Sequence, residues 1–224
     1  MKVLILDAGP VINLSINGLL ELFEKLSQLG DIKIVITEQV RKEIIDKPLG
    51  IPRFELGAIR AEKLMENKIL ILPESLGISK KEINAKTKEI QSRINNTFKA
   101  ENKFINIVSE AESSCLALSL ILTEKKIENI IAIDERTTRM LFEKPENLES
   151  LMSKKLHKRV YLANQDFRNI GKFRFIRSPE LVYVAYKKGL TELKSKKALE
   201  ALLYATKFKG SSVSYEEIKQ IKKM

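Results

Sequence analysis

The feature that most constrains this chain is a series of short apolar runs, two of which end directly in an acid. Residues 2–6 are followed by Asp7, and residues 130–133 are followed by Asp134. These runs show no alternation of polar and apolar residues, which is typical of strands buried on both faces of a parallel sheet. Segments of helical spacing lie between them. The pattern therefore predicts an α/β fold with a central parallel sheet flanked by helices.

Apolar residues recur at helical spacing between the runs, and they predict one helix over residues 11–29, one over 109–122 and one over 136–142. A polar, lysine-rich stretch over 79–103 has a sparse apolar stripe, so we expect an exposed helix that packs lightly on the body. Further short elements are predicted by composition and turn residues alone. These are strands at 32–36, 69–72, 159–162 and 173–176, and helices from 37 or 38, at 179–188, at 190–204 and from 212.

The domain organisation follows from the same pattern. We expect a core over residues 1–145 with a helical insertion at about 77–104. Residues 146–224 form a basic, mostly helical C-terminal extension packed on that core.

The charge of the chain is concentrated at one end. The net charge is +11; residues 151–224 carry +12 and residues 1–150 carry −1. Such asymmetry favours an anionic partner, most simply nucleic acid. The alternative is a solvated, lysine-rich surface, because a chain rich in Lys and Ile that lacks Trp resembles hyperthermophile proteins in composition.

Several classes of protein are excluded by simple counts. Cys115 is the only cysteine and His157 the only histidine, so the chain has neither a disulfide framework nor a structural zinc knuckle. We expect Cys115 to be a small buried hydrophobe and His157 a surface residue. No run of eighteen apolar residues occurs, and an acid at position 7 interrupts any signal-like segment. We therefore expect a soluble, cytoplasmic protein without a membrane segment.

Four carboxylates occupy positions from which they could meet. Asp7 and Asp134 follow strands, with Glu135 next to Asp134, while Glu43 and Glu112 lie early in helical segments. Ligands of open α/β sheets bind beyond the carboxyl ends of the strands. A cluster of oxygen ligands there selects Mg²⁺ or Mn²⁺, and such ions promote phosphodiester hydrolysis.

Each acid also has a purely structural interpretation, and these alternatives stay open at the level of sequence. Asp7 before Ala-Gly-Pro suits an Asx-turn, and Asp134 suits a helix N-cap. Glu112 completes a capping box with Ser109. Glu43 has basic neighbours and suits an ordinary surface position.

Four short motifs in this order resemble those of PIN-like nucleases, in particular a prokaryotic branch of that family. Residues 7–14 read Asp-Ala-Gly-Pro-Val-Ile-Asn-Leu. Residues 37–43 read Thr-Glu-Gln-Val-Arg-Lys-Glu, which is an acid, then a Val, then the functional acid Glu43. Residues 109–112 are similar to a Gly-Glu-Ala-Glu motif, with Ser in place of Gly. Residues 131–136 resemble a strand followed by two acids and an Arg. The resemblance covers about 1–50 and 105–142, and more loosely 178–222.

This resemblance implies a PIN-like three-layer fold and metal-dependent ribonuclease activity. The implied metal-binding and catalytic acids are Asp7, Glu43, Glu112 and Asp134, with Glu135 as an accessory group and Mg²⁺ or Mn²⁺ as the cofactor. The chain departs from the family where Ala8 and Gly9 replace the Thr or Ser found in many members. Residues 53–104 have no clear counterpart.

The leading functional hypothesis is therefore a metal-dependent endoribonuclease. The alternative is a non-catalytic, RNA-binding PIN-like protein that acts within a larger complex. A nucleotide-binding protein ranks last, because the chain lacks the glycine motifs that hold phosphates. Expected partners are RNA, a second copy of the chain in a homodimer, and an antitoxin-like protein, since many members of the family are toxins. The residues expected to contact RNA are Lys42, Arg136, Arg139, Lys154, Lys155, Lys158 and Arg159.

Overall fold

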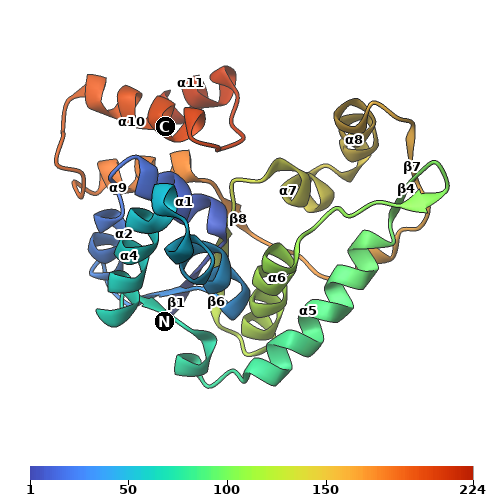
Figure 1. Ribbon diagram of the computed structural model, residues 1–224. Helices are drawn as coiled ribbons and strands as arrows, with labels where there is room; N and C mark the ends of the chain where they lie inside the picture. Colours follow the sequence, from blue (N-terminus) through green and yellow to red (C-terminus); the bar gives the residue numbers. More distant parts are fainter. Residues whose placement is uncertain (224) are drawn as a thin grey trace.

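The fold is built around a five-stranded sheet in which every neighbouring pair of strands is parallel. The computed structural model describes residues 1–223 and gives the strand order β3-β2-β1-β6-β8 (Figure 1). Residues 3–6 of the central strand are all buried, as a strand covered on both faces requires. The strands are β1 (Lys2–Leu6), β2 (Ile32–Val35), β3 (Leu70–Ile71), β6 (Glu128–Ala132) and β8 (Phe175–Ile176).

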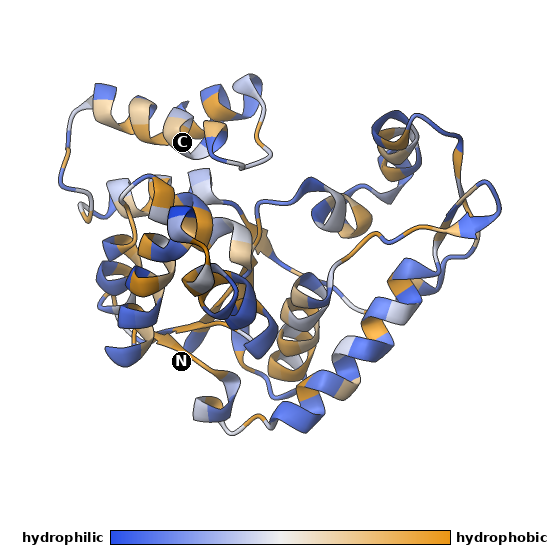
Figure 2. Ribbon diagram, viewed as in Figure 1, coloured by the Kyte–Doolittle hydropathy of each residue, from blue (hydrophilic) through white to orange (hydrophobic). Residues whose placement is uncertain are grey.

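Helices cover both faces of this sheet, so the predicted α/β architecture is confirmed. On one side lie α1 (Ala8–Ile16), α2 (Glu21–Ser27), α4 (Pro52–Glu66) and α9 (Ser178–Lys187) (Figure 1). On the other side α6 (Glu110–Glu124) packs on β1 and β6. Figure 2 shows hydrophobic residues concentrated in the strands and in α6.

The predicted helix over residues 11–29 is wrong in two respects. Its first part begins earlier, at Ala8, because Asp7 caps the helix. It is also divided into α1 and α2, and Gly18 between them has φ +68°. That left-handed backbone ends the first helix, since glycine adopts it without a steric penalty.

The lysine-rich helix α5 (Lys80–Asn95) is not lightly attached. It packs along α6, and Ile83, Ile90 and Ile94 of its narrow apolar stripe are buried. The chain then enters a second, antiparallel sheet of order β5-β4-β7. Its strands are β4 (Phe98–Ala100), β5 (Lys103–Phe104) and β7 (Val160–Leu162).

The C-terminal residues contribute to the core as well as extending it. Strand β8 completes the central sheet, and α9 packs against α1 and α2. A smaller apolar cluster joins α9 to the last two helices. The expected helix over 190–204 instead spans 196–208. The remaining helices are α3 (Glu38–Arg41), α7 (Arg136–Glu143), α8 (Leu148–Leu156), α10 (Lys196–Phe208) and α11 (Tyr215–Lys223).

Among the helices of residues 1–223, none is long and apolar enough to cross a membrane.

The approach to β8 depends on a glycine. Gly171 has φ +152°, and a Cβ at this position would lie 2.5 Å from Cδ2 of Leu120 on α6. We expect Gly171→Ala to lower the free energy of unfolding by about 1–3 kcal/mol, because it adds both strain and overlap. Gly50→Ala is the control, since nothing lies within 4 Å of its position. Equal thermal stability of the two variants would contradict this description.

Candidate functional site

The two strand-end aspartates lie beside each other at the carboxyl edge of the sheet. Strands β1 and β6 are paired in register, and the Asp7 backbone N–H donates to the Ala132 carbonyl at 3.0 Å. Gly9 lies between the two side chains. A Cβ on Gly9 would be 3.4 Å from Cβ of Asp134 and 3.6 Å from Oδ2 of Asp7. A methyl group at position 9 would therefore be in ordinary van der Waals contact with both aspartates.

Asp7 is the most perturbed acid of this edge. Its side chain caps α1, and the backbone N–H of Gly9 donates to Oδ2 at 3.5 Å. The residue is only 6% exposed. Burial, followed by the negative charges of Glu112 and Glu43, raises the pKa of Asp7 from 3.8 to about 7, despite hydrogen bonds from Ala8 and Gly9 that oppose the shift. Three predicted site acids are therefore electrostatically coupled.

Glu112 lies in the first turn of α6 and completes the capping box that its sequence context indicates. Its Oε2 accepts from the Ser109 backbone N–H at 2.7 Å, and its own N–H donates to Ser109 Oγ at 3.1 Å. Burial raises the pKa of Glu112 and the charge of Glu135 adds to the rise, whereas the bond from Ser109 opposes it. The structural role of Glu112 is therefore confirmed, and its charge also reaches Asp7.

Glu43 reaches the site from a distorted helical segment. The π-helical turn η1 (Lys42–Asp46) continues α3, whose N-cap Thr37 is 2.6 Å from Ser114 Oγ on α6. This contact holds the end of β2 close to α6. Glu43 is half-buried, and burial raises its pKa; Lys47 opposes the rise and Glu110 adds to it. Glu43 is therefore not an ordinary exposed surface residue, although its neighbours in the sequence are basic.

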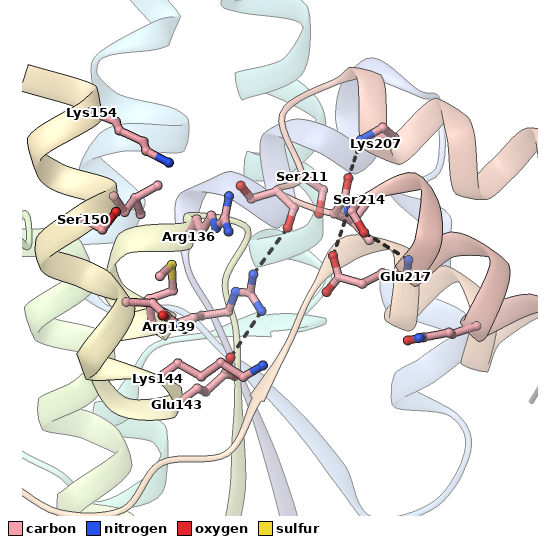
Figure 3. A pocket seen from close by; sticks show the side chains of 16 residues that line it. Arg136, Arg139, Glu143, Lys144, Ser150, Lys154, Lys207, Ser211, Ser214 and Glu217 are labelled. Atoms are coloured by element: carbon pink, nitrogen blue, oxygen red, sulfur yellow. Dashed lines mark hydrogen bonds and ion pairs between the residues drawn. The ribbon is translucent and has the colours of Figure 1, made fainter. Parts of the chain in front are cut away.

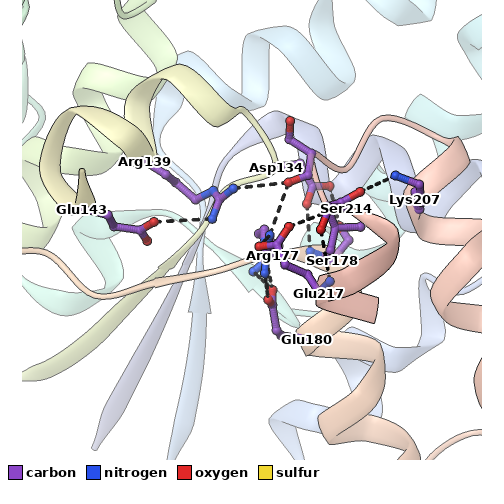
Figure 4. A network of polar contacts seen from close by, with 11 residues as sticks. Asp134, Arg139, Glu143, Arg177, Ser178, Glu180, Lys207, Ser214 and Glu217 are labelled. Carbon is purple, nitrogen blue, oxygen red and sulfur yellow. Dashed lines mark hydrogen bonds and ion pairs between the residues drawn. The ribbon is translucent and has the colours of Figure 1, made fainter. Parts of the chain in front are cut away.

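The side chain of Asp134 accepts hydrogen bonds that connect separate elements of the fold. Its Oδ1 accepts from the Ser178 backbone N–H at 2.8 Å, and its Oδ2 accepts from Ser178 Oγ at 2.6 Å and from Asn13 Nδ2 at 3.2 Å (Figure 4). These bonds connect β6 to the first turn of α9 and to α1. The expected helix N-cap is Glu135 instead, which accepts from the Thr138 backbone N–H at 2.9 Å.

The acids fit a divalent cation in donor chemistry and charge. Carboxylate oxygens are the ligands that Mg²⁺ and Mn²⁺ prefer, and a cation would stabilise the charged form of Asp7, whose pKa is raised by burial and by the charges of Glu112 and Glu43. Within residues 1–223, however, no three Asp, Glu, His or Cys side chains are close enough to hold one ion. The acids therefore suit such an ion chemically, but they do not form a ready-made set of ligands around one position.

The structure brings only some of the expected RNA-contacting residues together. Arg136, Arg139 and Lys154 line one cavity of about 1060 Å³ (Figure 3). Lys155 lies 3.9 Å from Oε1 of Glu135, and Lys158 is ion-paired with Glu101 at 2.7 Å. Lys42 and Arg159 are exposed outside the cavity.

An ion network around the buried guanidinium of Arg177 lies beside the cavity and was not predicted from the sequence. Arg177 is ion-paired with Glu180 and Glu217, and its Nη1 donates to the Ser212 carbonyl at 3.3 Å (Figure 4). The network fastens α11 to the start of α9. Only the Arg177–Glu180 spacing, typical of a helix start, could have indicated it.

Cys115 is fully buried with Sγ 3.7 Å from the Leu6 carbonyl, and His157 is an exposed residue that ends α8, both as expected.

Comparison of the chain with protein-family models, curated proteins and solved structures finds no match.

The buried Asp7 generates a prediction about pH. Its folded-state pKa of about 7 exceeds the unfolded value of 3.8, so the folded protein binds more protons between these values and loses stability as pH rises through them. Asp7→Asn removes this cost, at most about 4 kcal/mol, and Asn serves equally well as an N-cap. Without divalent ions, the variant should melt several degrees above the parent at pH 8 and close to it at pH 4. Parallel melting curves across this range would show that Asp7 is not destabilised by its surroundings.

Asp134 should behave in the opposite way. Asp134→Asn loses a charged acceptor of three hydrogen bonds, so we expect unfolding to become easier by about 3 kcal/mol. Glu62→Gln, an exposed change on α4, is the control and should leave the melting temperature unchanged. A stable Asp134→Asn protein would mean that these bonds contribute little to the fold.

Proposed function

We propose that this protein is a metal-dependent ribonuclease that hydrolyses phosphodiester bonds of RNA at the edge formed by Asp7, Glu112 and Glu43. The observation that supports this most strongly is the pKa of Asp7, raised to about 7 by burial and by two other acids. Strongly perturbed carboxylates concentrated at the carboxyl ends of parallel strands are typical of functional sites. The resemblance of four motifs to PIN-like nucleases favours the same chemistry.

The proposed roles of the acids differ. Asp7 is the central group, because it is the most deeply buried of the three acids and the charges of Glu112 and Glu43 act on it, so a bound cation would stabilise its carboxylate most. Glu112 and Glu43 supply the neighbouring negative charge. Asp134 is a positioning residue, since its oxygens already accept from Ser178 and Asn13.

Asp7, Glu112 and Glu43 would supply the carboxylate ligands of Mg²⁺ or Mn²⁺, and they would have to move closer together than they lie in this structure to hold the ion. A bound ion of this kind supplies an activated water and stabilises the leaving oxygen.

A second candidate is a non-catalytic RNA-binding protein of the same fold class. Two observations favour it: the oxygens of Asp134 are occupied by hydrogen bonds, and residues 1–223 contain no preformed group of three metal ligands. The homodimer and the antitoxin-like partner stay predictions. Light scattering of the purified chain tests the first of these.

The test is cleavage of a labelled single-stranded RNA with Mn²⁺ and with EDTA. We expect cleavage only with Mn²⁺, and we expect Asp7→Asn to reduce the rate at least about 100-fold. Glu112→Gln should also abolish cleavage while keeping its capping bonds, because Gln serves in the same motif. Glu62→Gln is the charge-matched control and should cleave normally.

A second readout does not depend on activity. Mn²⁺ should raise the melting temperature of the parent at pH 8 and not that of Asp7→Asn, because a ligand stabilises only the folded state that binds it. RNA binding without cleavage and without stabilisation by Mn²⁺ would favour the non-catalytic alternative. Cleavage that is insensitive to EDTA and to Asp7→Asn would contradict the proposal.

A further inference from the structure

We propose that the cavity between the α7–α8 segment and the end of the chain binds the phosphate backbone of single-stranded RNA without reading its bases. The choice of RNA as the ligand rests on the proposed function. The cavity itself is defined by the structure: it has a volume of about 1060 Å³, and its walls are α7, α8, and residues 207–220 (Figure 3).

The first support is positive charge that the protein does not neutralise. Five cations line the cavity, and three of them, Arg136, Lys144 and Lys154, form no ion pair within residues 1–223. Figure 3 shows Lys154 extending from α8 toward the side of the cavity that holds Arg136 and Ser211. All three cations come from the wall formed by α7, α8 and their connection, which suits a polyanion lying along that wall.

The two acids of the lining are already engaged. Glu143 lies 3.7 Å from Nη1 of Arg139, and Glu217 is ion-paired with Arg177 behind the wall. They therefore offset the charge of residues other than the three free cations.

The second support is a pair of buried polar atoms in the same lining. Oγ of Ser211 and Nε of Arg139 have no hydrogen-bond partner within the described chain, and the two residues are only 5% and 9% exposed. Leaving such a group unpaired costs about 1–3 kcal/mol. An anionic oxygen in the cavity is the kind of acceptor that both groups need, and phosphate supplies several such oxygens.

The opposite wall is held in place by cations that bind its backbone. Nη2 of Arg139 donates to the Ser212 carbonyl at 3.4 Å, and Nζ of Lys207 donates to the Val213 carbonyl. Arg177 donates to the Ser212 carbonyl from behind. These cations maintain the shape of the cavity, so a test of ligand binding must leave them unchanged.

The composition of the lining favours backbone contacts over base recognition. None of the described residues that line the cavity is aromatic, and aromatic side chains are the usual platforms on which single-stranded bases stack. Hydroxyl and amide groups are abundant instead, and these bind phosphate and sugar oxygens. The neutral polar residues are Asn147, Ser150, Ser211, Ser212, Ser214 and Gln220.

The cavity also adjoins the acidic edge. Arg136 directly follows Glu135, whose charge is felt by Glu112. An RNA strand held at Arg136 would therefore lie next to Glu135, on the side of the cavity that faces Glu112.

The experiment measures RNA binding by fluorescence anisotropy in EDTA, with oligo(U) and oligo(A) of twelve nucleotides and the full chain. Arg136→Gln with Lys154→Gln removes two of the free cations, both of which are exposed residues. We expect about tenfold weaker binding to both RNAs at low salt. The slope of log affinity against log salt should flatten by about 1.4, since each phosphate contact contributes about 0.7 on single strands.

The charge-matched control is Arg60→Gln with Lys63→Gln, two exposed cations on α4 outside the cavity. It should leave affinity and slope unchanged, and circular dichroism should show both double variants folded. Equal weakening by the two double variants would overturn the proposal, because it would indicate attraction by total charge.

Two other outcomes would also overturn it. A strong preference between oligo(U) and oligo(A) that the cavity variant abolishes would mean that bases are read there. Displacement of RNA by low millimolar inorganic phosphate, lost in the cavity variant, would identify a site for small phosphates instead. Because binding is measured without cleavage, failure of the nuclease proposal leaves this result interpretable, and the reverse also holds.

Discussion

The hydrogen bonds to the buried carboxylate of Asp134 are the interaction on which the arrangement of this protein depends. They connect the end of β6 with α1 and with the first turn of α9, segments more than forty residues away from Asp134 along the chain. The backbone carbonyl of Asp134 also accepts from the N–H of Ser212 at 3.3 Å. One residue thereby connects α1, the helix that Asp7 caps, with α9 and with the loop that lines the basic cavity.

Asp7, one strand away, is in the opposite situation. It is buried at the same edge, but the charged groups that act on it, Glu112 and Glu43, are acids, and only backbone hydrogen bonds from Ala8 and Gly9 offset its burial and their charge. Burial of a charge without a partner is unfavourable, so the fold keeps Asp7 at a cost in stability. We interpret this cost as the mark of function, since a site that must bind a cation or move a proton cannot satisfy its carboxylates in advance. The adjacent basic cavity would attract the polyanion that such a site acts on.

Much of the fold could be predicted from the sequence, because burial makes β1 and the second half of β6 continuous apolar runs, although the strand expected at 130–133 spans 128–132. The Ser109–Glu112 capping box was equally readable, since its pattern is local. The division at Gly18, the close packing of α5 on α6 and the entry of β8 into the sheet depend on contacts between distant segments.

For the site, position at strand ends indicated Asp7 and Asp134 as candidates. The sequence could not show that Asp7 is buried near two other acids whereas Asp134 accepts three hydrogen bonds, because Ser178 and Asn13 are brought to Asp134 only by the fold. Likewise, Lys144 and Lys207 belong to the cavity, whereas Lys158, also in the basic region, is paired with Glu101.

Asp7 is a buried acid on which the charges of Glu112 and Glu43 act, and a cation bound there would stabilise its carboxylate. The most direct measurement is the titration of its side-chain carboxyl carbon by NMR, assigned through Asp7→Asn, with and without Mg²⁺. We expect a pKa of about 7 in the absence of the ion and a clear fall when Mg²⁺ is added. A pKa near the ordinary value of 3.8 that Mg²⁺ leaves unchanged would contradict the account of this site.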